Sequence, residues 1–383
     1  MAANSTLFEP VQVGRMRLSS RIAMAPLTRY RADSEHVHRD PAVTYYAQRA
    51  SEPGTLIITE ATFVHAKAAG QKNAPGIFTD EQVQAWKRVV DAVHDKGSYI
   101  YLQLWALGRA ASADVLRAEA DEDVQSASDV PFEGGDNPRA LTKLEIQDYI
   151  GYYAQAAKRF VEEAGGDGVE IHSANGYLLD QFLQTNSNKR TDEYGGSVEN
   201  RCRFPLAVAH AVVDAVGADR VGIRLSPFSK FQGMKMDDTD EIKRTFSYYV
   251  EQLRQSFPDL AYIHGIESRI AGSETVDVDY NEQLDFIHDL WAPRPFLQAG
   301  GFDPSTALQA ARKYPNTVIV FGRYFISNPD LVRRIREGID LAPWNKDTFY
   351  LFGPEHTEGY IDYPFADDGW ASATWDDAVL SHF

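Results

Sequence analysis

Cysteine is almost absent from this sequence of 383 residues, in which Cys202 stands alone. One cysteine excludes an intrachain disulfide framework and any zinc or iron–sulfur site built from cysteines. We expect no metal site, and we interpret Cys202 as a small buried apolar residue rather than a redox sensor.

Positive charge is scarce as well. The 38 Lys and Arg residues are outnumbered by 55 Asp and Glu residues, which gives a formal net charge of −17. Binding to nucleic acids depends on clustered Lys and Arg, so we expect no nucleic-acid partner. Any phosphate group that the protein holds must be met by a local cluster of positive charge.

Long apolar runs are also missing. No stretch approaches the roughly 20 apolar residues that span a bilayer. Met1–Thr6 lacks the basic and apolar regions of a signal peptide, Ser381–Phe383 does not form a peroxisomal signal, and there is no prenylation box. We therefore expect a cytoplasmic protein with no membrane partner.

Apolar residues are nevertheless plentiful, at 44% of the chain, and they are grouped in short runs. Runs rich in β-branched residues alternate with longer amphipathic segments, which indicates a parallel sheet with crossover helices. The predicted strands are Arg21–Pro26, Thr55–Val64, Ser98–Ala106, Asp167–His172, Val221–Pro227, Leu260–Glu267, Pro295–Gly301 and Thr317–Ile326. The clearest predicted helices are Thr79–Lys96, Thr142–Glu163 and Asp237–Phe257.

This alternation predicts an α/β fold, a (β/α)8 TIM barrel in one domain over residues 1–383. The competing doubly wound sheet usually carries GxGxxG after its first strand, and that motif is absent. We expect a small N-terminal lid or hairpin in residues 1–20. Loop insertions are expected after His172 and at Leu107–Leu141, Ser268–Tyr280 and beyond Ala342.

The active residues of such a barrel lie at the C-terminal ends of its strands. The polar residues at those ends are Thr28, Glu60–Thr62, Gln103, His172, Asn175, Arg224 and Gly322-Arg323. This set contains no obvious pair of carboxylates flanking a bond, which argues against a glycosidase.

Two glycine-containing strand ends suggest a phosphate site, Ala299-Gly300-Gly301-Phe302 and Phe321-Gly322-Arg323. Barrel enzymes often bind phosphate after strands 7 and 8, where glycines let backbone N–H groups approach the anion. Arg323 would supply the local positive charge. Glycines at such positions also occur for packing alone, so the residues by themselves leave both interpretations open.

The most informative segment is His172-Ser173-Ala174-Asn175-Gly176-Tyr177. A His and an Asn at this spacing on a turn can aim two N–H donors at one carbonyl oxygen and stabilise charge that develops there. Tyr177 is a weak acid suited to protonating a carbanion or an enolate. On these residues alone the alternative stays open that His172 satisfies buried backbone groups and Tyr177 only packs.

The motif continues through Asn186–Ser197 and Glu199-Asn200-Arg201, and with it the sequence closely resembles the Old Yellow Enzyme family of FMN-dependent ene-reductases. The resemblance is strongest to fungal members and extends to the plant 12-oxophytodienoate reductases. It runs from Leu7–Pro10 to Gly359–Pro364. It implies that His172 and Asn175 bind a substrate carbonyl and that Tyr177 protonates the carbon α to it.

The resemblance also implies a tightly bound, non-covalent FMN. Thr28 would hydrogen-bond the isoalloxazine, Gln103 would contact its pyrimidine ring, and Arg224 would face the region where reduced flavin gathers negative charge. Without the family we would pair Arg224 with a carboxylate on a helix. The remaining residues that the resemblance assigns to FMN are Pro26, Leu27, Ala61, Gly300, Gly301, Phe302, Gly322 and Arg323, the last five of them at the phosphate.

Two aromatic residues are assigned to the substrate side. Trp105 is expected to lie toward the substrate, and Tyr350 matches an aromatic at the mouth of the pocket. Packing of Tyr350 within the C-terminal tail itself is the alternative.

These expectations together predict an ene-reductase that uses NADPH, or NADH, to reduce the C=C bond of a small enone or enal. Hydride would come from flavin N5 and the proton from Tyr177. One alternative is a flavin-dependent isomerase, since some relatives with Phe in place of this Tyr isomerise their substrates. A dedicated reductase of a secondary-metabolite pathway and a non-catalytic flavin-binding barrel are the others. The sequence leaves open whether the protein is a monomer or a homodimer.

Overall fold

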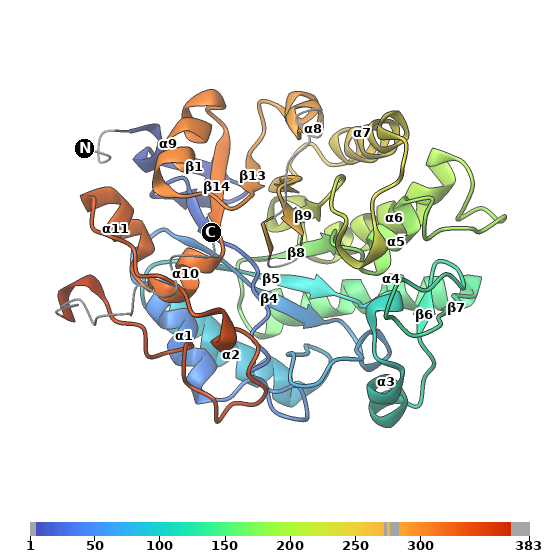
Figure 1. The fold of residues 1–383 in the computed structure, drawn as a ribbon, viewed down its shortest axis with the longest axis horizontal. Helices are drawn as coiled ribbons and strands as arrows, with labels where there is room; N and C mark the ends of the chain where they lie inside the picture. The colour runs from blue at the N-terminus through green and yellow to red at the C-terminus, as the bar shows by residue number, and fades with distance from the viewer. Residues whose placement is uncertain (1–4, 272–273, 276–282, 369–383) are drawn as a thin grey trace.

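Eight parallel strands form a closed barrel at the centre of the molecule (Figure 1). The computed structural model describes residues 5–271, 274–275 and 283–368. The strands are β3 (Ile22–Met24), β4 (Leu56–Phe63), β5 (Tyr99–Trp105), β8 (Gly168–Ser173), β9 (Val221–Leu225), β10 (Tyr262–Ile266), β13 (Phe296–Ala299) and β14 (Thr317–Phe321). Neighbours in the barrel are neighbours in the chain, and β14 pairs with β3 to close it. The predicted (β/α)8 barrel is confirmed.

Helices surround the barrel (Figure 1). The longer ones are α1 (Asp40–Arg49), α2 (Asp80–His94), α4 (Lys143–Lys158), α6 (Val198–Val216), α7 (Thr239–Ser256), α8 (Asp285–Trp291), α9 (Pro304–Lys313) and α11 (Leu331–Glu337). Thr79 and Thr142 begin α2 and α4 with capping boxes, in which the Thr hydroxyl and the side chain three residues later satisfy each other's backbone N–H groups. A π-helical turn, Arg159–Glu163, continues α4. The three helices predicted from the sequence are confirmed.

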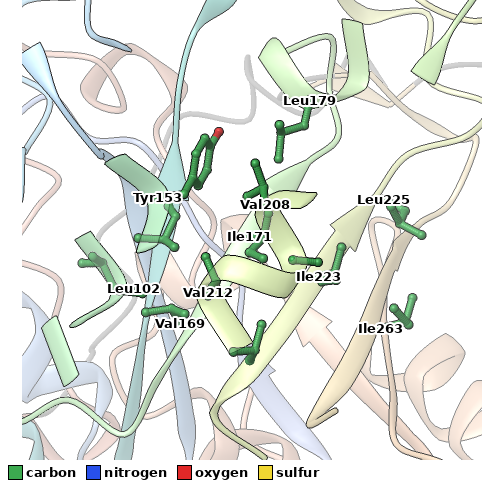
Figure 2. Packing of buried hydrophobic residues seen from close by; sticks show 14 of the residues in the cluster. Leu102, Tyr153, Val169, Ile171, Leu179, Val208, Val212, Ile223, Leu225 and Ile263 are labelled. Carbon is green, nitrogen blue, oxygen red and sulfur yellow. The ribbon is translucent and has the colours of Figure 1, made fainter. Parts of the chain in front are cut away.

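The core has two layers, one on each side of the strands. Outward-facing strand residues such as Ile171 and Ile223 pack against Val208 and Val212 of α6, as Figure 2 shows. Inward-facing residues, among them Tyr101, fill the barrel itself. Burial of these apolar side chains contributes about 25 cal/mol for each Å² removed from water.

The chain begins with an antiparallel hairpin of β1 (Val11–Val13) and β2 (Met16–Leu18). Val13, Met16 and Leu18 are buried in the interior cluster of the barrel. A Cβ at Gly14 would lie 2.2 Å from the carbonyl oxygen of Asp219, so the hairpin is seated tightly against the segment that enters β9. The predicted N-terminal lid is present, and it closes the end of the barrel where the strands begin.

The predicted insertions surround the opposite end. Leu107–Leu141 contains α3 (Ala113–Ala120) and a short parallel pair, β6 (Gln125–Ser126) and β7 (Arg139–Ala140). A hairpin of β11 (Ile270–Ala271) and β12 (Glu274–Thr275) belongs to the predicted Ser268–Tyr280 insertion, and residues 272–273 and 276–280 of that insertion lie outside the described residues.

The C-terminal tail returns to the loop after β3. Arg29, fully buried in that loop, donates hydrogen bonds to the carbonyl oxygens of Phe349 (3.2 Å) and Gly359 (2.7 Å). The tail is thereby tied to the loop that carries Thr28.

One strand is shorter than predicted. The predicted strand Thr317–Ile326 ends at Phe321, and the apolar residues after it belong to a short helix, α10 (Arg323–Ser327). A short apolar run has no periodicity that separates strand from helix, and Gly322 leaves the extended conformation between the two. In the part of the chain that the structure describes, no helix is long and apolar enough to cross a membrane.

Candidate active site

A cavity of about 1000 Å³ opens at the C-terminal ends of the strands. Every site residue predicted from the sequence lines it, except Trp105. Those that do are Pro26, Leu27, Thr28, Ala61, Gln103, His172, Asn175, Tyr177, Arg224, Gly300, Gly301, Phe302, Gly322, Arg323 and Tyr350. Residues from all parts of the chain therefore meet in one place, as the barrel predicts.

The floor of this cavity is a row of polar side chains set by strand register. Gln103 of β5 pairs with Glu170 of β8, and two residues further on His172 of β8 pairs with Arg224 of β9, which pairs with His264 of β10. Side chains two residues apart on a strand share a face, so Glu170 and His172 point to the same side. We define the floor as Gln103 and Arg224, which line the cavity, together with Glu170 and His264, which are fully buried and do not line it.

A buried carboxylate organises the floor. Glu170 accepts a hydrogen bond from Nε2 of Gln103 (2.7 Å) and lies 2.8 Å from Nδ1 of His264. Burial acts to raise the pKa of Glu170, but His264 and Arg224 outweigh it and hold that pKa below its usual range. Glu170 is thus an anion. It orients the Gln103 amide and balances the charge of Arg224, so the carboxylate beside Arg224 comes from a strand and not from a helix.

His172 is held as a neutral imidazole. Its ring is buried, and burial together with the nearby Arg224 lowers its pKa well below the usual value. A neutral ring carries one N–H, which it can donate to an oxygen in the cavity. His172 can therefore act as a hydrogen-bond donor without introducing a second positive charge.

The turn after β8 carries the other two residues of the predicted motif. Asn175 and Gly176 both have left-handed backbones, with φ of 57° and 74°, which reverses the chain sharply. The hydroxyl of Ser226 accepts a hydrogen bond from the Asn175 N–H (2.7 Å), and Asp180 accepts one from the Gly176 N–H (2.9 Å). These bonds hold Asn175 and Tyr177 at the edge of the cavity.

Trp105 is the one predicted site residue that lies behind the lining of the cavity. Its ring is buried and does not line the cavity. It stacks on Phe63, with ring centroids 4.9 Å apart, and meets Tyr177 edge to face at 5.0 Å. The preceding residue, Leu104, packs into the outer core, so the alternation of the strand turns Trp105 to the inner side, where the ring of Tyr177 covers it. Trp105 supports Tyr177 instead of facing the cavity.

The far end of the cavity is lined by the glycines. Gly300 and Gly301 precede α9, and Gly322 with Arg323 begins α10. Gly301 has a φ of 63°, a conformation that glycine adopts without strain. A Cβ at Gly300 would lie 2.6 Å from the side chain of Glu267, so only glycine fits there. Without side chains at these glycines, an anion can approach their backbone N–H groups beside Arg323.

The mouth of the cavity is aromatic, and most of it was not predicted. Tyr30, Phe132, Phe231 and Tyr350 line it from four separate loops. Tyr30 meets the ring of Tyr350 edge to face, with centroids 5.7 Å apart, and Tyr350 is 46% exposed. This favours the pocket over tail packing for Tyr350. The sequence did not predict Tyr30, Phe132 and Phe231 as cavity residues, because their proximity depends on the conformations of three separate loops.

Comparison with known proteins identifies the family. The model of the NADH:flavin oxidoreductase / NADH oxidase family matches residues 6–342. The chain belongs to this family. Solved structures of Old Yellow Enzyme type are similar over nearly the whole chain. Old Yellow Enzyme from Pichia sp. AKU4542 has a TM-score of 0.88 and 38% identity over 96% of this chain and 95% of its own. Morphinone reductase in complex with tetrahydroNAD has a TM-score of 0.84 and 38% identity over 95% and 98%.

Curated relatives are more similar still. Chanoclavine-I aldehyde reductase fgaOx3 of Penicillium roqueforti (strain FM164) is 52% identical over 94% of this chain and 96% of its own. Aldehyde reductase FrzD of Cladobotryum sp is 48% identical over 96% of each. A protein of Claviceps purpurea (strain 20.1) named probable inactive dehydrogenase easA is 47% identical over 95% of this chain and 96% of its own. This protein is thus a fungal-type Old Yellow Enzyme, an FMN-dependent oxidoreductase that uses a nicotinamide cofactor.

The cavity fits FMN. Two buried nitrogens of its lining have no hydrogen-bond partner among the residues that the structure describes: Nδ1 of His172 and Nε of Arg224. Buried polar nitrogens are costly to leave unsatisfied, and a polar ring or water would relieve them. The bare glycines and Arg323 at the other end suit a phosphate. Within residues 5–271, 274–275 and 283–368, no group of three or more His, Cys, Asp or Glu side chains could hold a metal ion.

Proposed function

We propose that this oxidoreductase reduces the C=C bond of α,β-unsaturated aldehydes and ketones with electrons from NADPH or NADH. The observation that carries the proposal is the meeting of a neutral imidazole, an amide and a phenol, from His172, Asn175 and Tyr177, at one side of a cavity that fits FMN. Two relatives are named aldehyde reductases, which favours an enal as the first substrate to test. A relative named as probably inactive is nearly as similar to this chain as the two aldehyde reductases are. Sequence identity alone therefore does not distinguish an active enzyme from an inactive one, and the residues of the site carry the proposal.

The residues that would hold FMN divide into two groups. Gln103 and Arg224 would meet the pyrimidine part of the ring, beside Thr28 and Ala61, while the glycines of β13 and β14 and Arg323 would meet the phosphate. When bound, FMN accepts a hydride from the nicotinamide and passes one to the alkene. The fixed positive charge of Arg224 favours the reduced cofactor, which is more negative than the oxidised one.

His172 and Asn175 would bind the carbonyl oxygen of the substrate. As hydride reaches the β-carbon, negative charge grows on that oxygen, so donors fixed there stabilise the transition state more than the bound substrate. A neutral His172 is suited to this role because it donates an N–H without holding the oxygen as a permanent ion pair.

Tyr177 would supply the proton to the α-carbon. Burial raises the pKa of Tyr177, so the phenol stays protonated until the proton is transferred to the α-carbon of the substrate. The rings of Trp105 and His172 pack against Tyr177 at 5.0 and 4.9 Å between centroids and fix its direction. A phenol in this position favours net reduction over isomerisation, since the α-carbon receives a proton from the enzyme.

The test compares Tyr177→Phe with the wild type. Reduction of the bound FMN by NADPH should stay nearly unchanged, while reduction of a weakly activated enone such as cyclohexenone should slow by roughly 10²-fold, the usual weight of a general acid. Unchanged turnover would remove Tyr177 from the mechanism. The wild-type product should gain two hydrogens by mass spectrometry, whereas an isomerase would return a product of unchanged mass and a non-catalytic barrel would return substrate.

A further inference from the structure

The loop after β9 reaches the turn that carries Asn175 and Tyr177. A 3-10 turn, Phe231–Gly233, lies at its tip, and its three residues line the cavity. Gln232 has a left-handed backbone, with φ of 58° and ψ of 38°. Side chains other than glycine adopt this conformation at a cost, and non-glycine residues held in it gather at functional sites. The backbone preference of Gln232 itself does not favour this left-handed conformation, so contacts with other parts of the protein must maintain it.

Contacts on both sides clamp this loop. Arg109 donates a hydrogen bond from Nη2 to the carbonyl oxygen of Gln232 (3.0 Å), and Asn186 donates one from Nδ2 to that of Gly233 (2.6 Å). On the other side the loop lies against Gly176, where an added Cβ would be 3.1 Å from the Cβ of Gln232. The left-handed backbone is therefore maintained by its surroundings.

The side-chain amide of Gln232 faces the catalytic turn. Its Nε2 donates a hydrogen bond to the carbonyl oxygen of Asn175 (3.1 Å). Its Oε1 is buried and has no hydrogen-bond partner among the described residues. Tyr177 lines the same cavity as Gln232, and a hydrogen bond from the amide would oppose the rise in the pKa of Tyr177 that burial causes. The amide is thus bonded to the start of the turn and lies in the cavity that Tyr177 also lines.

We propose that Gln232 is a positioning residue for proton delivery: its amide fixes the Asn175–Tyr177 turn and holds the Tyr177 hydroxyl toward the α-carbon of the substrate. This inference rests on the proposed function. The transferred proton comes from the Tyr177 oxygen, the hydride comes from the reduced cofactor, and Tyr177 regains a proton from solvent.

The Gln232 amide can stabilise the negative charge that forms on Tyr177 during proton transfer. When Tyr177 gives up its proton, negative charge appears on a buried oxygen, and an N–H donor beside it lowers the cost of that charge. The other groups that face Tyr177 are Tyr30 and Tyr350, which raise its pKa, and Arg224, which lowers it. Arg224 also balances Glu170 in the floor, whereas the Gln232 amide is neutral and has a second N–H besides the one that it donates to Asn175.

The test is a double-mutant cycle on the half-reaction with cyclohexenone. Gln232→Met keeps the length of the side chain and removes its hydrogen bonds. In the wild-type background it should slow reoxidation of the NADPH-reduced enzyme by about tenfold, while reduction by NADPH changes less than about twofold. In the Tyr177→Phe background the same change should have less than about a twofold effect, because the partner is already absent.

Two controls separate positioning from folding. Gln147 of α4 donates a hydrogen bond to the hydroxyl of Tyr194 (3.1 Å), and neither residue lines the cavity. Gln147→Met is therefore the matched substitution and should leave both half-reactions unchanged. The long-wavelength band that para-chlorophenol forms with the bound flavin should persist in Gln232→Met, since His172 and Asn175 remain.

Three results would overturn the inference: an equal loss in the Tyr177→Phe background, no loss in the wild-type background, or loss of FMN and of the phenol band together with the rate. If the wild type itself does not reduce cyclohexenone or an enal, the proposed function fails before the variants are compared.

Discussion

The floor and the mouth of the cavity are built in opposite ways. The floor residues Gln103, Glu170, Arg224 and His264 come from neighbouring strands, are buried, and meet through strand register. The mouth residues come from loops far apart in the chain and are in part exposed, Tyr350 by 46%. A strand ladder allows few alternatives, whereas loops can change without disturbing the barrel. We infer that the floor and the His172–Tyr177 segment beside it set the chemistry, and that the mouth sets the choice of substrate.

The largest effect is expected just above the floor, at the carbonyl-binding pair. The double variant His172→Ala with Asn175→Ala should abolish the long-wavelength band with para-chlorophenol and slow enone reduction by roughly 10³-fold or more, since one such donor accounts for ~10²–10³ in other enzymes. Absorbance titration and single-turnover kinetics measure the two effects. FMN content should stay the same, and a surviving phenol band would exclude these residues as the oxygen-binding pair.

The next effect concerns the floor carboxylate. Glu170→Gln leaves Arg224 without its compensating charge, and removal of one partner from a buried charge network typically costs about 3 kcal/mol of unfolding free energy. Urea denaturation should show this loss. The comparison is Glu162→Gln, which breaks an exposed pair with Lys158 and should change the unfolding free energy by less than about 0.5 kcal/mol. Equal effects of the two substitutions would mean that the floor is not organised by Glu170.

A pH-dependent effect is expected behind the catalytic turn. Burial raises the pKa of Asp180 to about 7, against the opposing hydrogen bonds from Gln184 and Gly176. The unfolded chain loses this proton near pH 4, so the native state binds more protons between pH 4 and 7, and stability falls as pH rises through that window. Between pH 5 and 8 the wild type should lose about 2 kcal/mol relative to Asp180→Asn. Parallel stability curves would show that Asp180 is ionised throughout.

The smallest effect is expected at the mouth. Tyr350→Ala removes an exposed ring that touches Tyr30 and leaves every floor contact intact. KM for a bulky enal should rise about two- to fivefold, while kcat and the KM for a small enone stay nearly constant, because an exposed aromatic contact contributes about 0.5–1 kcal/mol. Steady-state kinetics on the two substrates measure the difference. A drop in kcat for both would place Tyr350 among the residues that act on the chemistry.

The same contrast explains what could be predicted from the sequence. Alternating strands and helices predicted the barrel and the ends of its strands, and the barrel then placed Gln103, His172 and Arg224 together. The Glu170–His264 pair was not predicted, because it depends on the register between strands. The contact of Trp105 with Tyr177 was not predicted, because alternation tells the side of a strand but not which neighbour covers it. Gln232 was missed since nothing local marks a left-handed residue in a loop.

We propose that His172 and Asn175 hold an alkene substrate beside the FMN site, so that electrons from the nicotinamide reach its C=C bond. A single-turnover experiment tests it most directly, with NADPH-reduced protein mixed anaerobically with one equivalent of an enal and the product mass measured. We expect oxidised flavin absorption to recover together with the formation of a product two hydrogens heavier. Flavin that stays reduced, or a product of unchanged mass, would contradict it.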